Sequence, residues 1–128
     1  MAPQPATARP GALLPPAAIV LVVVGALGVL GGIVGFAFGG AVPPVVRYAN
    51  VGAAVIEIAV GLGLRGGGTH RLRAAWAFAV SCEGTISLIN LIALPQMAHA
   101  GAVGAISIVF AVARGGLCIV LSMARDEV

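Results

Sequence analysis

The chain has 128 residues, of which 60% are hydrophobic and 9% are charged, and its mean hydropathy is +1.12. Soluble proteins carry roughly 25% charged residues because their surfaces face water, so this composition excludes an ordinary soluble domain and predicts a membrane protein. The formal charge of +3 comes from arginines that are spread along the chain without interleaved aromatic residues, which argues against a nucleic-acid partner.

The N-terminal residues 1–16 are rich in proline and lack apolar periodicity, so we expect a disordered tail that ends at Pro15-Pro16. The uncharged run 17–40 follows and exceeds the roughly 20 residues that cross a bilayer. A cleaved signal peptide is the alternative. It is disfavoured because the apolar run is long and no small-x-small cleavage site precedes Pro43.

Three further apolar runs follow the first span. Pro43-Pro44 marks a turn before the second run, a basic loop (RGGGTHRLR) separates the second and third, and Pro95-Gln96 starts the turn before the fourth. The connections are short, so consecutive helices must be neighbours. We therefore predict an all-α transmembrane domain over 17–124, an antiparallel up-down-up-down four-helix bundle followed by a short C-terminal tail. The spans and the tail are 17–40, 45–64, 74–94, 102–124 and 125–128.

The arginines outside the spans and at their ends are distributed unevenly between the two sides of this bundle. With four spans, both termini and the basic loop share one side, and the other side carries Arg47 alone. The positive-inside rule then predicts a protein of the cell inner membrane with both termini in the cytoplasm. The arginines on the predicted cytoplasmic side are Arg9, Arg65, Arg71, Arg73 and Arg125.

Glycines recur at a spacing of four in the first span. The pairs are Gly28/Gly32, Gly31/Gly35 and Gly35/Gly39. Small residues at this spacing allow another helix backbone to approach closely in a membrane. Two interpretations remain open, namely packing onto the other helices of the same chain and an interface with a second copy or a partner membrane subunit.

Each of the last three spans contains one ionisable residue near its middle: Glu57, Glu83 and Arg114. Each also has a polar residue seven positions away, which lies on the same helical face because seven residues make nearly two turns. Those companions are Asn50, Asn90 and Ser107, and Ser87 lies between Glu83 and Asn90. Ionisable groups in hydrocarbon are costly and are usually paired or functional, so these residues form the candidate site.

Alternating helix directions predict that the two glutamates lie at one level and the two asparagines at another. Arg114 is expected at the glutamate level and Ser107 at the asparagine level. The guanidinium group can then bind one carboxylate through two parallel hydrogen bonds. The second carboxyl is left without a cation and is expected to hold a proton in a dry site.

Sequence signals for enzymatic chemistry, metals and cofactors are missing. His70 and His99 fall in loops on opposite sides of the membrane, and Cys82 and Cys118 form no CxxC pair. The glycine-rich loop lacks the spacing and the lysine of a phosphate-binding loop. We therefore expect neither an enzyme nor a bound cofactor.

Two functions fit the polar residues. In the first, the protein is an accessory or interaction subunit, in which the Glu/Glu/Arg set locks the helices together. In the second, it is a small proton- or cation-coupled transporter or channel that uses a titratable glutamate. The expected partners are the lipid bilayer and either further copies of the chain or another membrane subunit.

Overall fold

The structure is a computed structural model that describes residues 12–38, 42–66 and 69–128. These residues form helices only, which confirms the predicted all-α class. Four of the helices are long and apolar enough to cross a membrane, which indicates a multi-pass membrane protein. The elements are α1 (Leu14–Phe38), α2 (Pro44–Arg65), α3 (Thr69–Ile92), α4 (Leu94–Ala98), α5 (Gly101–Met123) and the 3₁₀ turn η1 (Ala124–Glu127).

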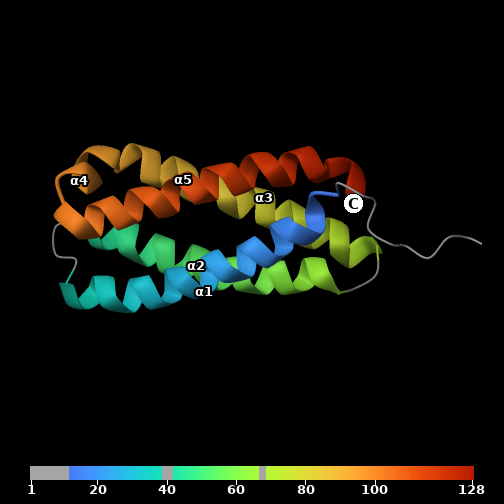
Figure 1. Ribbon diagram of the computed structural model, residues 1–128, viewed down its shortest axis with the longest axis horizontal. Coiled ribbons are helices and arrows are strands. Elements are labelled where there is room, and N and C mark those ends of the chain that lie inside the picture. The colour runs from blue at the N-terminus through green and yellow to red at the C-terminus, as the bar shows by residue number, and fades with distance from the viewer. Residues whose placement is uncertain (1–11, 39–41, 67–68) are drawn as a thin grey trace, which may run out of the picture.

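The four long helices lie side by side along the long axis of the molecule (Figure 1). Helix α2 packs between α1 and α3, and α5 closes the arrangement by contacting both α3 and α1. The short helix α4 lies at one end and packs on α5. Polar side chains on α2, α3 and α5 can therefore meet in the interior.

Helix α1 begins earlier than the sequence indicated. Pro15 and Pro16, which we expected to end the tail, lie in the first turn of α1, and residues 1–11 of that tail lie outside the described residues. Proline is tolerated there because the first amides of a helix have no partner within it. The Glu127 carboxylate accepts hydrogen bonds from the amides of Leu13 and Leu14, both at 3.0 Å. This contact joins η1 to the start of α1.

The basic loop predicted at 65–73 is largely helical. Helix α2 continues to Arg65 and α3 begins at Thr69, so Arg71 and Arg73 are exposed residues in the first turns of α3. The polar residues here indicate where α2 and α3 would leave the hydrocarbon of a membrane. They do not indicate where the helices themselves end. Residues 67–68 lie outside the described residues.

The connection between α3 and α5 contains α4, which the sequence analysis missed. Pro95 was expected to start a turn, but it lies in the first turn of α4, where its missing amide is tolerated. Gly101 follows with a φ of +65°, a conformation that favours glycine, and α5 starts there. Gly104 then packs directly against the Met97 carbonyl group, which brings α5 close to α4.

The apolar core is concentrated at the end of the molecule where α1 begins. Its buried side chains come from α1, α2, α3, α5 and η1, and the largest are Leu14, Leu21, Leu64, Leu117 and Leu121. Trp76 is half-buried beside this cluster and donates a 2.7 Å hydrogen bond to the Leu121 carbonyl group. A smaller cluster of Val42, Val46 and Ala93 lies near the other end.

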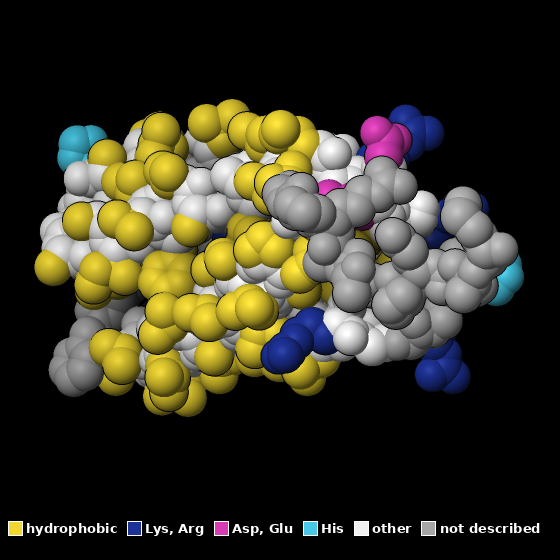
Figure 2. Space-filling view, turned by 45° about the vertical axis from the view of Figure 1, so that its right-hand side comes forward, with side chains coloured by type: hydrophobic (Ala, Val, Ile, Leu, Met, Phe, Trp, Pro, Cys, Tyr) yellow, Lys and Arg dark blue, Asp and Glu magenta, His cyan; other side chains and the backbone are white. Residues whose placement is uncertain are grey.

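The outer surface is predominantly apolar. In Figure 2 hydrophobic side chains cover most of the body, and several basic side chains gather at one end of the face shown. Many large side chains are more than half exposed, including Leu30, Ile33, Leu91, Val112 and Ile119. In water such a surface would aggregate, whereas it suits contact with acyl chains or with other membrane helices.

Candidate functional site

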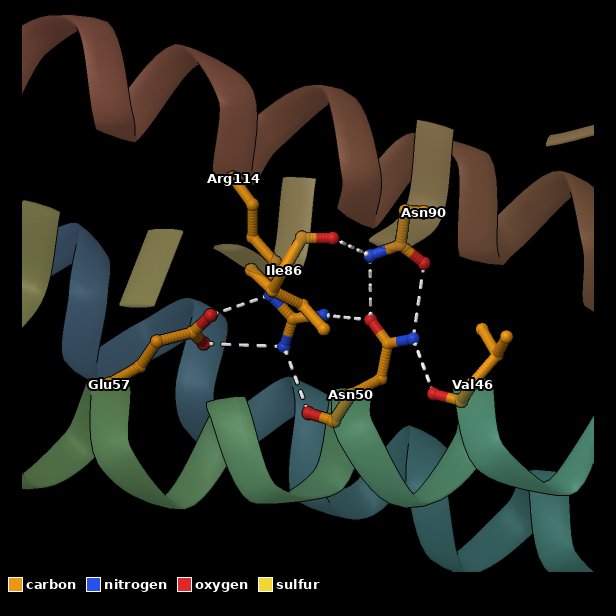
Figure 3. A network of polar contacts seen from close by, with 6 residues as sticks. All are labelled: Val46, Asn50, Glu57, Ile86, Asn90 and Arg114. Atoms are coloured by element: carbon orange, nitrogen blue, oxygen red, sulfur yellow. Dashed lines mark hydrogen bonds and ion pairs between the residues drawn. The ribbon is translucent and has the colours of Figure 1, made fainter. Parts of the chain in front are cut away.

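The centre of the candidate site is a buried ion pair between α5 and α2. Arg114 is 1% exposed and Glu57 is 0% exposed. The Arg114 Nε atom lies 2.5 Å from Glu57 Oε1, and Nη2 lies 3.4 Å from Oε2 (Figure 3). The expected pairing of Arg114 with a glutamate is therefore present, in the bidentate geometry that suits a planar guanidinium group.

Arg114 also binds Asn50, which lies seven residues before Glu57 on α2. Its Nη1 atom donates to Asn50 Oδ1 at 2.5 Å, and Nη2 donates to the Asn50 carbonyl oxygen at 3.4 Å. The sequence placed Arg114 at the glutamate level only. The structure shows that its side chain joins the glutamate and asparagine levels, because the guanidinium group presents donors along two edges.

Asn50 and Asn90 form a reciprocal amide pair between α2 and α3. Each Nδ2 atom donates to the other Oδ1 atom, at 3.1 Å and 3.0 Å. The second hydrogen of each amide binds a carbonyl oxygen four residues earlier on its own helix, that of Val46 or Ile86 (Figure 3). The polar hydrogens of both amides are therefore satisfied, as a buried network requires.

Glu83 is buried beside this network but differs from Glu57. It is 0% exposed, and no described residue donates a hydrogen bond to either of its carboxyl oxygens. Glu57 is paired with Arg114, whereas no ion pair among the described residues includes Glu83. Because an isolated buried carboxylate is very costly, the arrangement suits one ionised and one neutral acid.

The two serines of the candidate site do not join the network through hydrogen bonds. Ser107 donates to the Val103 carbonyl group on its own helix at 2.9 Å. Ser87 is half-buried, and its hydroxyl oxygen has no hydrogen-bond partner among the described residues. Ser107 instead lines a cavity between α1, α2 and α5, together with Asn50 and Arg114.

The glycines predicted for helix packing have different surroundings. A side-chain carbon added at Gly28 would lie 2.9 Å from Ala54 Cβ and 3.0 Å from Arg114 Nη2, and one at Gly32 would collide with Val51. Gly32 therefore faces α2 of the same chain, and Gly28 faces both α2 and the Arg114 side chain of α5. A carbon added at Gly35 would meet nothing within 4 Å, and Gly39 lies outside the described residues.

Two glycines that the sequence analysis did not select lie against the backbone of the opposite helix, Gly25 on α1 and Gly61 on α2. A carbon added at Gly25 would lie 2.6 Å from the Ala54 carbonyl oxygen, and one at Gly61 would lie 2.9 Å from the Ala18 carbonyl oxygen. The available signal was a spacing of seven between small residues, Ala18/Gly25 on α1 and Ala54/Gly61 on α2. Each glycine packs against the alanine of the other helix.

Comparisons with protein families, curated proteins and solved structures find no match to this chain. In the described part of the chain, no three His, Cys, Asp or Glu side chains are grouped so that they could hold a metal ion. The functional interpretation therefore depends on the geometry of the buried polar network and its surroundings.

Proposed function

We propose that this chain is an accessory or interaction subunit of the cell inner membrane, in which a polar network locks α2, α3 and α5 together. In this proposal α1, α2, α3 and α5 cross the bilayer in alternating directions and both termini are cytoplasmic. The observation that carries the proposal is a continuous network of hydrogen bonds between the three helices. Glu57 binds Arg114, Arg114 binds Asn50, and Asn50 binds Asn90.

The packing around the network favours a structural role, in which the helices are locked together, over a pathway for protons or ions. On the side of Glu57 towards the start of α1, the interior is filled by the apolar cluster that contains Leu21, Leu64, Leu117 and Leu121. A proton or an ion would need polar groups or water along its route through this part of the bundle. The apolar filling instead suits a rigid unit that presents its outer surface to lipid and to another membrane protein.

Glu83 favours a second candidate, a small proton-linked transporter. Its carboxyl oxygens accept no hydrogen bond from the described residues, so a change in its charge would not break a contact of the lock. A buried acid that can change its charge without disrupting the helices is what such a transporter requires. This candidate is distinguished from the lock by the effect of removing each carboxylate separately.

The test compares Glu57→Gln, Glu83→Gln and the control Asp126→Asn, which removes an exposed carboxylate. The full chain is extracted in mild detergent, and the mass and composition of its complex are measured. We expect a complex of fixed stoichiometry that is lost in Glu57→Gln and retained in the other two variants. The reason is that, of these three carboxylates, Glu57 is the one that forms an ion pair with Arg114.

The second measurement is pH-gradient-driven flux into liposomes that contain the reconstituted chain. The subunit proposal expects no flux in the wild type. A flux that Glu83→Gln abolishes while assembly is intact would establish the transporter instead. A wild-type chain that extracts as a monomer would overturn the proposed role as a subunit.

A further inference from the structure

A cavity of about 490 Å³ lies between the second half of α1, the first half of α2 and the first half of α5. Its walls are apolar, with Leu27, Leu30 and Val34 on one side and Ile106 and Phe110 on the other. Leu30 is 61% exposed and Ile106 is 57% exposed, so the walls reach the outer surface. The cavity is therefore a groove that opens sideways, towards the acyl chains in a membrane.

The groove exists because α1 leaves α5 while it stays on α2. Near its start α1 packs into the core with α5 through residues such as Leu21. Further along, Gly28 and Gly32 remain against α2, whereas added carbons at Gly31 and Gly35 would meet nothing within 4 Å. Small residues on this face leave open the space that larger side chains would fill.

The charged residues that line the groove are both arginines. Arg114 lies on its inner wall, where Glu57 neutralises it. Arg47 lies in the first turn of α2, and no carboxylate among the described residues is within ion-pair distance of it. Its Nη1 atom donates to the Gly35 carbonyl oxygen at 3.4 Å, and its Nε atom is buried without a partner in the described part of the chain.

The position of Arg47 matches the headgroup level of a bilayer. It lies three residues after Pro44, where α2 begins, and its guanidinium carbon lies 5.6 Å from the centre of the Phe36 ring. The neighbouring Tyr48 is exposed, and its ring lies 5.1 Å from that of Phe36. Aromatic and basic side chains gather in this way at the membrane–water interface.

We propose that this groove binds one anionic phospholipid, with its phosphate group on Arg47 and one acyl chain between α1 and α5. Arg47 supplies an uncompensated positive charge with a guanidinium geometry suited to a phosphate group. The apolar walls lead from that charge towards the middle of the membrane, in the direction that an acyl chain follows. The inference goes beyond the proposed subunit role, because it assigns a lipid ligand that the subunit role does not require.

The test is native mass spectrometry of the full chain in detergent, titrated separately with phosphatidylglycerol and phosphatidylcholine. We expect the wild type to retain one phosphatidylglycerol with a preference of about fivefold over phosphatidylcholine, the ratio expected for one arginine beside a headgroup of net negative charge. Phosphatidylcholine also has a phosphate group, but its choline group neutralises that charge. Arg47→Gln is expected to remove this preference. Arg65→Gln is the matched control, because Arg65 is exposed at the other end of α2, and it should keep the preference.

A second variant tests the acyl-chain part of the groove. Gly31→Leu adds a side chain into open space, so it is expected to leave the thermal unfolding midpoint unchanged and to weaken binding of both lipids. Equal binding of the two lipids by the wild type would overturn the proposal, as would full preference in Arg47→Gln. Tighter binding of oleate than of phosphatidylglycerol would assign the groove to a free fatty acid instead. A Gly31→Leu variant that loses a homodimer and keeps its lipid would assign the groove to a second copy.

Discussion

Glu57 and Glu83 have identical side chains and are both fully buried, yet their surroundings give them different roles. Glu57 accepts two hydrogen bonds from Arg114, whereas no described residue donates to Glu83. Removing one member of a buried ion pair leaves the other charge without a partner. The two acids should therefore respond differently to neutralisation, although the sequence presents them as equivalent.

A double-mutant cycle of Glu57→Gln and Arg114→Gln tests the energetics of this pair. We expect each single variant to lower the free energy of unfolding by about 3 kcal/mol, because each leaves an unpaired charge in the interior. The double variant should lose about 4 kcal/mol, well below the sum of the two single losses, which corresponds to a coupling energy of about 2 kcal/mol. The measurement is reversible unfolding in mixed micelles, and additive losses would contradict the pairing.

At the scale of the helix pair, α1 and α2 are held mainly by close packing, beside the hydrogen bond that Arg47 donates to the Gly35 carbonyl oxygen. Gly25 and Gly61 each lie against a backbone carbonyl group of the opposite helix, those of Ala54 and Ala18. In a membrane, lipid competes equally well for apolar side chains, so helix association depends on such close contacts. These two positions should be among the least tolerant of added volume on α1 and α2.

Gly61→Ala tests this contact against the control Gly52→Ala. An added carbon at Gly61 would lie 2.7 Å from Val22 Cγ2 and 2.9 Å from the Ala18 carbonyl oxygen, whereas one at Gly52 would meet nothing within 4 Å. We expect Gly61→Ala to lower the free energy of unfolding by about 1–3 kcal/mol through overpacking. Gly52→Ala should leave it unchanged or raise it by up to about 1 kcal/mol, because alanine is the better helix former. Equal effects at the two positions would exclude close packing at Gly61.

At the scale of the whole molecule, the beginning of α1 and the end of η1 lie at the same end, joined through Glu127. Exposed arginines lie near both of these segments and near the connection from α2 to α3, namely Arg65, Arg71, Arg73 and Arg125. This distribution supports the proposed orientation, because basic residues are retained on the cytoplasmic side of a membrane.

Reporter fusions test that orientation. Alkaline phosphatase is active only outside the cytoplasm, so we expect a fusion after Val128 to be inactive and a fusion after Val42 to be active. A fluorescent protein after Val128 should be fluorescent, which shows that the inactive fusion is expressed. Phosphatase activity after Val128 would place the C-terminus on the opposite side and contradict the positive-inside assignment.

Hydrophobic run length and helical periodicity determined a large part of this description from the sequence alone. Runs of about 20 apolar residues require helices in a membrane, because every backbone group must be satisfied within the chain. The spacing of seven placed Asn50 with Glu57, and Glu83 with Asn90, on single helical faces. These are local properties of a helix, so they can be read without knowledge of its neighbours.

Only the tertiary structure decided which of these groups meet. Arg114 pairs with Glu57 and reaches Asn50, while Glu83 has no donor among the described residues, and the groove beside Arg47 opens where α1 leaves α5. Such contacts depend on the rotation, tilt and separation of packed helices and on the reach of long side chains. Hydropathy carries no information about those variables, because many helix rotations bury the same apolar surface equally well.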